Sequence, residues 1–481
     1  MATNLKPDSL SGTKYLLVFH SFGFYTDTFA YMKNLKNLGI IPPINLLYLG
    51  AWLKAHGAEV ELLDCHALSL PMDEALKQAS TKEFDFLCFT AVNLDFLYLK
   101  EWLRAFHKRF DAPILVGGVG ARNYPAEIAS LPEVKAVFHS PAETCVVEWT
   151  RAYLDKLEWW KVAGTCVNYE GQVYNNAKLA HPKDVVLPLP AREILPDKNL
   201  YFSTLSELRP FTAGMSVFGC PYGCDYCSNR LTPVHPRSAE DIVNELEVCE
   251  RELGYREIDY FDANFLLPPE RVFEIADLYA KRNLSIRWSC RVRVDKVERE
   301  QLKAMARSNC SWIGYGIESG DEDVLRGVNK YQGGIDHIRD VLKATHEEGI
   351  GITGFFILGL PGEDEDSLKN TLEFIGSAPF DFVQISPYWP VPGTPVYNRL
   401  VQEAGMDPWK TVIESDSLDH DMHLPGTKFS LREMHEHTSR FYREFYFRPS
   451  QFLKILKKTS NIAQFKKYST AGMDLMKSWL P

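Results

Sequence analysis

Three features that would classify a chain of 481 residues at once are missing from this sequence. The formal net charge is −10, so the basic surface that nucleic-acid binding requires is absent, and we expect neither RNA nor DNA as a partner. No apolar run reaches the 18 residues of a membrane span, since residues 40–53 are interrupted by Pro42, Pro43 and Asn45. No basic and apolar leader opens the chain. These absences predict a cytoplasmic protein.

Cysteines are also few for a disulfide framework, and most stand alone. We expect the isolated ones to be small buried side chains in a reducing compartment. They are Cys65, Cys88, Cys145, Cys166, Cys249, Cys290 and Cys310. The hydrophobic fraction of 45% is sufficient for large cores, and the length argues for two or three domains.

The remaining three cysteines share one short loop. Cys220, Cys224 and Cys227 have the spacing C-x3-C-x2-C, with Gly and Pro residues that allow a tight turn. Structural zinc normally takes four ligands in two pairs, and no second pair follows, although His235 would be available as a fourth ligand of a zinc knuckle. Three thiolates fit a [4Fe–4S] cluster that leaves one iron open. We therefore predict an iron–sulfur site, with zinc as the alternative.

This loop, with Tyr226 just before the third cysteine, resembles the signature of the radical S-adenosylmethionine (SAM) superfamily. The resemblance is greatest to members with an N-terminal cobalamin-binding-type domain. It implies a [4Fe–4S] cluster whose open iron chelates SAM, and an external electron donor of the flavodoxin or ferredoxin type. It also implies cobalamin as a further cofactor.

Residues 1–150 alternate short apolar strands with helices. Such a pattern predicts a parallel sheet covered on both faces, a doubly wound Rossmann-like α/β fold. The expected strands are 15–20, 59–64, 86–91, 114–118 and 136–138, and the expected helices are 46–56 and 94–110. Thr90, Gly117 and Gly118 end two of these strands, and the resemblance assigns them to the nucleotide tail of cobalamin. The alternative is an ordinary Rossmann-like sheet whose glycines only form turns.

Two motifs depart from the cobalamin-binding pattern. The family often has a G-E-G-E turn after the last strand, and of it only Glu143 is retained within residues 139–144. A D-x-H triplet occurs at Asp64-Cys65-His66, but it follows the second strand, whereas the histidine motif that ligates cobalt elsewhere follows the first. We therefore expect that no histidine of this chain ligates the cobalt.

Residues 151–205 read as a linker, and residues 206–400 as a second series of strands and helices. Six parallel strands with crossover helices predict a partial (β/α)6 barrel with its chemistry at the C-terminal rim. The expected strands are 215–218, 257–261, 286–290, 312–317, 354–358 and 382–385. Residues 401–481 are expected to form a helical extension.

Polar residues follow several of these barrel strands. The resemblance implies that Asp262 and Glu318 accept hydrogen bonds from SAM, that Arg293 lines the SAM pocket, and that Gly359 lies near the adenine. Holding SAM rigidly against the cluster requires such groups. Residues 388–395, rich in Pro and aromatic side chains, either close over this site or form a plain exit loop.

The tail, residues 440–481, is basic and interleaved with apolar side chains. It either contacts an anionic membrane surface or packs on its own domain. The predicted function is reductive cleavage of SAM to functionalise an unreactive carbon of a small-molecule or lipid substrate, by cobalamin-dependent methylation. The alternatives are radical cyclisation, dehydration or rearrangement without methyl transfer, and a binding protein with a structural cluster.

Overall fold

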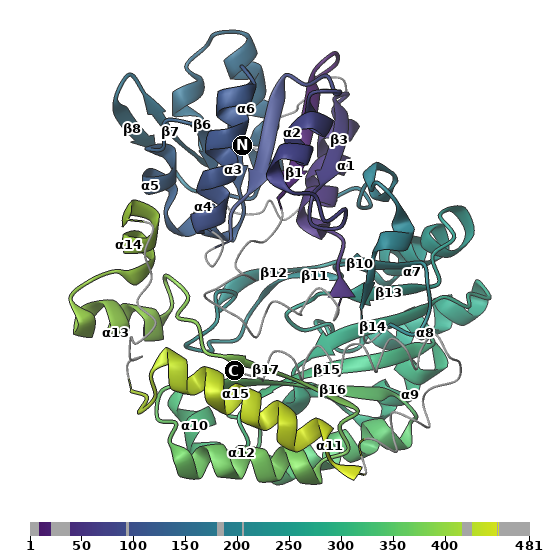
Figure 1. The fold of residues 1–481 in the computed structure, drawn as a ribbon. Coiled ribbons are helices and arrows are strands. Elements are labelled where there is room, and N and C mark those ends of the chain that lie inside the picture. Colours follow the sequence, from purple (N-terminus) through teal and green to yellow (C-terminus); the bar gives the residue numbers. More distant parts are fainter. Residues whose placement is uncertain are drawn as a thin grey trace. The chain divides into compact units, whose positions relative to one another are not determined.

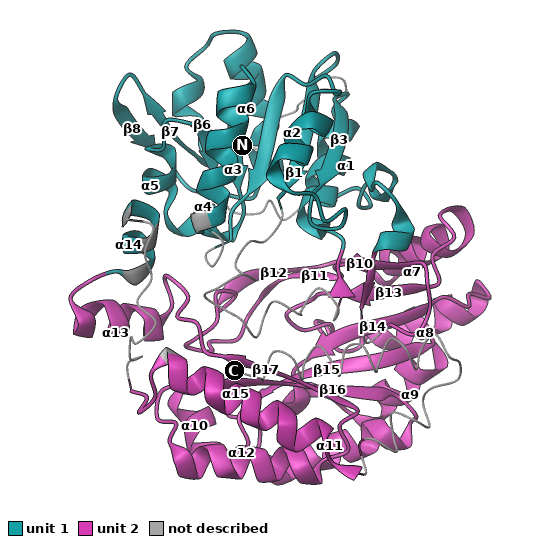
Figure 2. Ribbon diagram, in the orientation of Figure 1, with its two compact units in different colours: residues 1–30, 42–200, 407–418 teal, residues 31–41, 201–406, 419–481 magenta. Residues whose placement is uncertain are grey.

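The structure is a computed structural model that describes residues 9–20, 39–92, 96–179, 187–203, 206–415, 426–449 and 451. The chain divides into two compact units, which are coloured separately in Figure 2. Unit 1 comprises residues 1–30, 42–200 and 407–418, and unit 2 comprises residues 31–41, 201–406 and 419–481. Figure 1 labels the elements of both units, and each unit is described here by itself.

Unit 1 is built on a seven-stranded sheet in the order β3-β1-β4-β5-β6-β7-β8. The five strands from β3 to β6 are parallel, and β7 and β8 add to them antiparallel. The strands are β1 (Lys14–Phe19), β3 (Glu59–Asp64), β4 (Phe86–Thr90), β5 (Ile114–Gly117), β6 (Val134–Phe138), β7 (Thr165–Tyr169) and β8 (Gln172–Asn175). The helices are α1 (Ile44–Ala55), α2 (Met72–Ala79), α3 (Phe96–Arg109), α4 (Val119–Asn123), α5 (Pro125–Ala129) and α6 (Val146–Leu154).

Strand β4 shows that this sheet is covered on both faces. All five of its residues are buried, so the continuous apolar run predicted a strand without a solvent-facing side. Phe86 stacks on Tyr15 of β1 and meets Trp149 of α6 edge to face, with ring centroids 5.1 and 6.2 Å apart. The doubly wound fold predicted for this part of the chain is confirmed.

The segment predicted as a linker is instead largely part of unit 1. Its hairpin β7–β8 continues the sheet beyond β6, because Val137 pairs with Cys166 and Phe138 with Thr165. Trp160 stacks on Tyr169 at 4.1 Å between ring centroids. The turn signals of this segment mark a hairpin of unit 1, and the change from unit 1 to unit 2 falls near its end, between residues 200 and 201.

Unit 2 is built on a six-stranded parallel sheet in the order β10-β13-β14-β15-β16-β17. The strands are β10 (Phe211–Gly214), β13 (Glu257–Tyr260), β14 (Arg287–Val292), β15 (Cys310–Glu318), β16 (Gly351–Leu358) and β17 (Phe382–Pro387). The helices between and after them are α7 (Ala239–Glu247), α8 (Arg271–Lys281), α9 (Arg299–Arg307), α10 (Glu322–Gly327), α11 (Ile335–Glu347), α12 (Glu365–Ser377) and α13 (Pro395–Ala404). The partial barrel is confirmed.

The first barrel strand lies earlier in the chain than the sequence predicted. Residues 211–214 pair with β13, whereas residues 215–218 leave the sheet. A separate antiparallel ribbon, β11 (Val217–Cys220) and β12 (Thr232–Pro236), then carries the cysteine loop. A second short ribbon pairs β2 (Gly39–Ile40) with β9 (Phe202–Ser203). The apolar run at 215–218 was therefore correctly identified as extended but assigned to the wrong sheet.

Helix α15 (Leu431–Tyr446) covers the free edge of the barrel sheet. The Tyr442 hydroxyl accepts from the Ile385 N–H and donates to the Ile385 carbonyl, both at 2.9 Å, and Tyr446 does the same at Val383. A spacing of four residues on a helix, about 6 Å, matches two residues along a strand, about 6.7 Å. The two tyrosines thus satisfy an edge that would otherwise be open to pairing.

The C-terminal extension does not form one body. Helix α14 (Pro408–Ser415) belongs to unit 1, where the buried Lys100 donates to the Ile413 carbonyl at 2.6 Å and Tyr124 donates to Asp407 at 2.9 Å. Most of the basic tail, residues 452–481, lies outside the described residues. Among the helices that the structure describes, none is long and apolar enough to cross a membrane.

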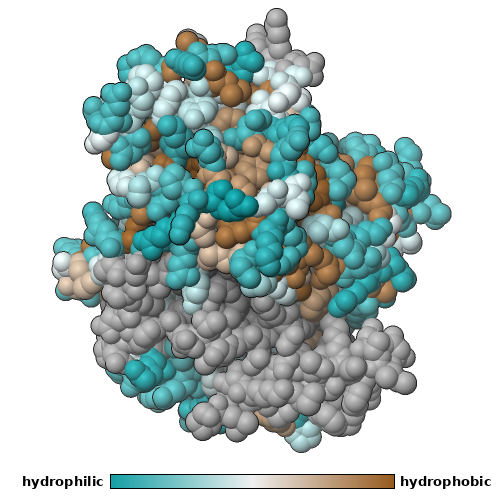
Figure 3. All heavy atoms as spheres, turned by 45° about the horizontal axis from the view of Figure 1, so that its top comes forward, coloured by the Kyte–Doolittle hydropathy of each residue, from teal (hydrophilic) through white to brown (hydrophobic). Residues whose placement is uncertain are grey.

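The surface carries few large apolar residues, and Figure 3 shows hydrophilic and apolar side chains interspersed on one face. In the described part of the chain, three such residues are more than half exposed: Leu231 at 63%, Leu157 at 60% and Phe447 at 59%. Leu231 lies in the loop of the three cysteines.

Candidate active site

The cysteine loop begins at a point where only glycine fits. Gly219 has a φ of +85°, and a Cβ on it would lie 1.9 Å from the Pro233 carbonyl oxygen on the facing strand β12. This close approach turns the chain so that Cys220 can follow, with its N–H donating to Thr232 Oγ1 at 2.8 Å. Cys220 and Cys224 are 8% and 6% exposed, and Cys227 is more accessible.

Backbone hydrogen bonds fasten the loop to distant segments of unit 2. The Asp225 N–H donates to the Val328 carbonyl at 3.0 Å, and the Asp225 carbonyl accepts from the Val396 N–H at 3.2 Å. The Asn329 side chain donates to the Gly223 carbonyl at 2.9 Å. The loop is therefore held in place without any bound group.

Arg293 places a cation directly beside one of the thiols. Its guanidinium donates to Cys224 Sγ at 3.4 Å, lies 4.2 Å from the centroid of the Tyr222 ring, and is fixed by Asp295 at 2.9 Å. A neighbouring cation favours the thiolate that a metal needs. The structure thus brings Arg293 to the cysteine loop, and its expected place in the SAM pocket stays a prediction.

Glu318 forms a buried ion pair that the sequence did not reveal. Lys330 Nζ lies 3.3 Å from Glu318 Oε1, and the two residues are 6% and 8% exposed. Glu318 has a φ of +74°, which is unusual for a residue with a long side chain and is the kind of strain found at functional sites. Lys330 follows α10 without a recognisable motif, so only its buried contact identifies it.

Tyr226 and Cys227 lie in the field of this ion pair. Burial raises the pKa of Tyr226 well above its usual value, and the negative charge of Glu318 adds to that shift. Burial also raises the pKa of the Cys227 thiol, while the Asn229 N–H and the charge of Lys330 act in the opposite direction. Lys330 therefore opposes the effect of burial on the Cys227 thiol.

Asp262 has a different place from the one expected. Its carboxylate accepts from the Ser216 N–H at 2.7 Å, from the Val217 N–H at 3.0 Å and from the Ser216 hydroxyl. Arg271, which also donates to Ser216, supplies the balancing charge. Both oxygens thus accept hydrogen bonds within the protein, so Asp262 anchors the chain that leads into the cysteine loop, and its contact with SAM stays a prediction.

Gly359 also makes close contacts within the protein. It has a φ of +91°, a Cβ on it would lie 1.7 Å from Met434 Sδ of α15, and its N–H donates to Glu363. Burial raises the pKa of Glu363 to about 8. Glycine is required here by the packing of α15, and the expected contact with adenine remains a prediction.

The ends of the unit 1 strands present a different arrangement. Thr90 is 4% exposed and its hydroxyl accepts from the Asn45 side chain at 3.1 Å. A Cβ on Gly117 would meet nothing within 4 Å, whereas a Cβ on Gly118, whose φ is +100°, would lie 2.6 Å from the Ala91 carbonyl oxygen. We therefore correct the role of Gly118: it serves the packing of this turn, and Gly117 is the glycine that borders open space.

The two motifs that depart from the cobalamin-binding pattern, residues 64–66 and 139–144, also make local contacts. Asp64 accepts from the Ala67 N–H at 2.8 Å, and His66 meets the Phe19 ring edge to face at 6.0 Å. Asp64 is the last residue of β3 and His66 lies two residues beyond it, so the D-x-H triplet ends the second strand of the main sheet and not the first. Glu143 lies in a short 3-10 helix, Ala142–Thr144.

Comparison with known families supports both halves of this description. The model of the radical SAM superfamily matches residues 216–375, and that of the B12 binding domain matches residues 34–148. The chain carries a B12-binding domain and a radical SAM domain. The predicted cofactors, a [4Fe–4S] cluster, SAM and cobalamin, follow from these two domains.

Several relatives are similar to this chain over most of its length. An uncharacterized methyltransferase of Pyrococcus horikoshii is 25% identical over 86% of this chain and 89% of its own length. An anaerobic magnesium-protoporphyrin IX monomethyl ester cyclase of Rubrivivax gelatinosus is 23% identical over 76% of this chain and 66% of its own. The solved structure of the radical SAM methyltransferase TsrM from Kitasatospora setae, with cobalamin and a [4Fe–4S] cluster bound, has the same fold, with a TM-score of 0.66, 15% identity, and coverage of 98% and 89%.

The residues of the radical SAM unit fit a cluster with three protein ligands. The loop offers three thiols, two of them beside buried cations. Among the described residues, no group of three or more His, Cys, Asp or Glu side chains stands close enough to hold a single metal ion. A fourth protein ligand is not needed where SAM completes the open iron.

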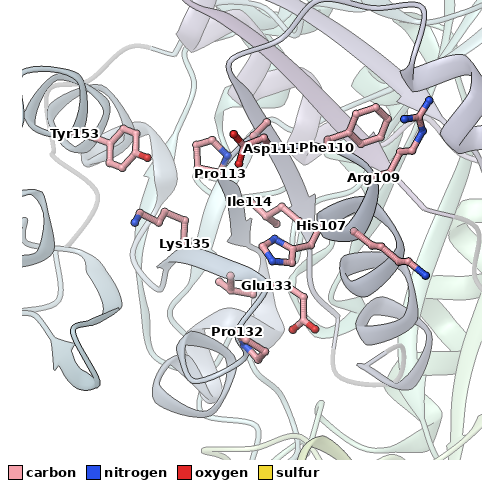
Figure 4. Close-up of a pocket in the computed structure, with 13 residues that line it drawn as sticks. His107, Arg109, Phe110, Asp111, Pro113, Ile114, Pro132, Glu133, Lys135 and Tyr153 are labelled. Atoms are coloured by element: carbon pink, nitrogen blue, oxygen red, sulfur yellow. The ribbon is translucent and has the colours of Figure 1, made fainter.

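A cavity in the B12-binding unit lies away from the residues expected to hold cobalamin. Figure 4 shows this space of about 610 Å³, lined by the end of α3 and the beginnings of β5 and β6, with His107, Lys135 and Tyr153 around it. Doubly wound folds bind ligands at the carboxyl ends of their strands, and this is the opposite edge. We therefore do not assign the cavity to the cofactor.

Proposed function

We propose that this chain is a cobalamin-dependent radical SAM methyltransferase that methylates an unreactive carbon of a small-molecule or lipid substrate in the cytoplasm. The observation that supports it most is the union in one chain of a three-thiol loop flanked by buried cations with a strand end whose glycine borders open space. The cluster and SAM supply a carbon radical, and cobalamin supplies the methyl group.

The residues of the radical SAM unit take distinct roles in this proposal. Cys220, Cys224 and Cys227 hold the cluster, and Arg293 with Lys330 balances its negative charge. Glu318 accepts a hydrogen bond from the SAM ammonium, and Lys330, 3.3 Å from its carboxylate, holds it in place. Tyr226 stays protonated at physiological pH, because burial and Glu318 raise its pKa, so its hydroxyl remains a donor.

In the B12-binding unit, Thr90 and Gly117 border the nucleotide tail of cobalamin. Asn45 fixes the Thr90 hydroxyl, and the absence of a side chain at Gly117 leaves room for close approach to the backbone. No histidine of the described residues is assigned to the cobalt.

A second candidate keeps the radical step but omits methyl transfer. The similarity to the Rubrivivax gelatinosus cyclase favours it, as does the altered turn at residues 139–144. Under this alternative the substrate radical closes a ring or eliminates a group.

Anaerobic reconstitution with iron, sulfide and excess cobalamin tests the choice. The proposal expects an absorption spectrum with both cluster and corrin bands, SAM cleavage with dithionite, and transfer of isotope from methyl-labelled SAM to the bound corrin. A chain that cleaves SAM but stays free of corrin supports the second candidate instead. A chain that binds iron without cleaving SAM contradicts both.

A further inference from the structure

The barrel sheet of the radical SAM unit has one face that its helices cover and an inner face on the opposite side. Helices α11 and α12 lie against β15 and β16 (Figure 1). Phe356 of β16 meets Phe374 of α12 with ring centroids 6.3 Å apart, and Tyr315 of β15 bonds to Thr345 of α11 at 2.7 Å. Successive residues of a strand point to opposite faces, so the neighbours of Phe356 and Tyr315 point to the inner face. These neighbours include Gly314, Gly316 and Phe355.

Two side chains on the inner face are accessible to solvent. Phe355 is partly exposed, and Gln384, its neighbour in register on β17, is exposed. A Cβ on Gly314 would lie 2.5 Å from the Phe355 ring, so the ring can approach the backbone closely only because residue 314 is a glycine. In a closed barrel the inward side chains pack against one another in layers. Here Phe355 and Gln384 are available to a bound molecule.

The positive charge on this face is balanced within the protein. A Cβ on Gly314 would also lie 3.3 Å from Arg291 Cγ, so Arg291 shares the inner face. Its guanidinium donates to both carboxylate oxygens of Asp259, at 2.5 and 2.9 Å, and lies 3.7 Å from the centroid of the Phe261 ring. We call four of these residues the inner strip: Phe261, Arg291, Phe355 and Gln384. The inner strip offers two aromatic rings, a neutral amide and a cation that already has its counter-ion.

A buried hydroxyl on the same face lacks a partner. Thr353 lies two residues before Phe355 on β16, so it shares that face, and it is 2% exposed. Its hydroxyl forms no hydrogen bond with the residues that the structure describes. A buried polar group without a partner is costly, so this hydroxyl indicates a hydrogen-bonding group that a ligand supplies.

The inner strip adjoins the residues expected to meet SAM. Gly316 is the neighbour of Phe355 in register, and a Cβ on it would lie 2.8 Å from Glu318 Oε1 and 3.5 Å from Lys330 Nζ. A molecule on the inner strip would therefore lie beside the cofactor that the proposed function requires.

We propose that the inner strip selects the substrate, and that the substrate is an uncharged small molecule with a flat ring and a hydrogen-bonding group such as an amide. The ring stacks on Phe355, and the polar group bonds to Gln384 or Thr353. This inference rests on the proposed function and narrows it. A phospholipid or a nucleotide would bring a negative charge that Arg291, already paired with Asp259, does not balance.

Simple aromatic probes test the chemistry of the inner strip. The reconstituted chain, with cluster and SAM bound and no reductant, is titrated with para-fluorobenzamide and followed by fluorine NMR, and we expect saturable binding. Under the same conditions para-fluorobenzoate, which has a carboxylate in place of the amide, should bind roughly tenfold more weakly, because its charge has no partner. Cyclohexanecarboxamide, which lacks the flat ring, should compete roughly threefold to tenfold less well than benzamide.

Substitutions in the inner strip show where the probe binds. Gln384→Leu removes the amide, and Phe355→Leu removes the ring but keeps an apolar side chain. Each should weaken the binding of para-fluorobenzamide roughly threefold to tenfold. Gln172→Leu is the matched control, since Gln172 is also an exposed glutamine on a strand but lies in unit 1, and it should bind the probe as the wild type does. Thermal melting checks that each variant folds, and the comparison of probes on the wild type depends on no variant.

Any one of four results overturns the inference. The wild type may show no saturable binding of para-fluorobenzamide, may bind para-fluorobenzoate as tightly, or may bind cyclohexanecarboxamide as tightly as benzamide. The fourth is undiminished binding by folded Gln384→Leu and Phe355→Leu. SAM cleavage with dithionite is measured on the same preparations. A wild type that cleaves SAM and gives one of these results rejects only the inference, whereas a wild type that does not cleave SAM rejects the proposed function.

Discussion

In the B12-binding unit, the residues at the strand ends leave the backbone exposed to open space. In the radical SAM unit, the corresponding region holds buried ionisable side chains. Gly117 borders a void and Thr90 presents a neutral hydroxyl. Glu318, Lys330, Arg293 and Asp262, by contrast, are ionisable residues that are all less than 9% exposed.

The difference follows from what each unit has to hold. A large cofactor can be bound through its many atoms by shape and backbone contact, so the protein keeps side chains out of the way. A cluster and a sulfonium ligand are small and charged, and their reactivity depends on nearby charges. Charge buried in the radical SAM unit is stable only because each ion has a partner, as Glu318 has Lys330.

The largest expected effect is on the cluster. Replacing Cys220, Cys224 or Cys227 by Ala should abolish SAM cleavage and remove the iron, because each is one of only three protein ligands. Corrin binding by the other unit should persist. The readouts are iron analysis and the absorption spectrum. Cys88→Ala is the control, and loss of iron in that variant would contradict the ligand assignment.

Next in size is the loss of the corrin. Gly117→Val should leave the fold intact and prevent cobalamin binding, because its side chain would occupy the open space beside the strand end. Gly118→Ala should instead lower the melting temperature, since its Cβ would overlap the Ala91 carbonyl. Cobalamin absorbance and thermal melting separate the two. If Gly117→Val bound the corrin normally, the open space at this strand end would have no role in cobalamin binding, and the contrast drawn between the two units would fail.

The next prediction tests a buried carboxylate of the radical SAM unit through the variant Asp262→Asn. The variant replaces a carboxylate that accepts from the Ser216 and Val217 N–H groups, and each charge-assisted hydrogen bond that is lost costs about 1.5–3 kcal/mol. We expect that loss in the free energy of unfolding from chemical denaturation. Asp277→Asn, on the exposed face of α8, should cost almost nothing. If Asp262→Asn kept its stability and lost only SAM affinity, Asp262 would face SAM after all.

A smaller effect is expected at Glu318. Loss of a charge-assisted hydrogen bond costs about 1.5–3 kcal/mol, so Glu318→Gln should weaken SAM binding roughly ten- to a hundredfold while the iron content is unchanged. Lys330→Arg should retain most of the affinity for SAM, because it keeps a positive charge beside Glu318. Lys330→Gln removes that charge and should lose affinity. Equilibrium dialysis with labelled SAM gives the affinities. If all three variants bound SAM as tightly as the wild type, the Glu318–Lys330 ion pair would have no role in SAM binding.

The last expected effect is a slope of stability with pH, which is the smallest when it is taken per pH unit. Burial raises the pKa of Glu363 to about 8 from a usual value near 4.5, so the folded state keeps a proton that the unfolded state releases. Stability should therefore fall between about pH 4.5 and 8, by at most about 1.4 kcal/mol per pH unit for one proton, and level off above. Glu363→Gln should flatten this slope. Glu257, with a pKa of about 7, leaves a residual slope of the same sign.

Denaturation curves at several pH values measure that slope. Glu373→Gln, on the exposed side of α12, is the control and should not alter it. A slope that survives Glu363→Gln unchanged would show that this carboxyl is ionised in the folded protein.

The sequence predicted much of this fold because its signals are local. Near-continuous apolar strands and intervening helices gave both sheets, and β3 begins and ends where the pattern indicated. The errors occurred where a local signal has two tertiary outcomes. Residues 215–218 look like a barrel strand, yet Asp262 fixes Ser216 outside the sheet. Turn signals at 166–173 mark a hairpin whether it lies in a linker or continues a sheet.

By itself, the sequence determined the three cysteines, the order of the two domains and the small residues at strand ends, since each depends on residue type and spacing along the chain. Only the tertiary structure decided which carboxylates are free to meet a ligand. Asp262 and Glu318 follow similar strands, but one is consumed by backbone donors and the other is paired with Lys330. The reason is physical: a buried charge is defined by its partners, and those partners lie far away in sequence.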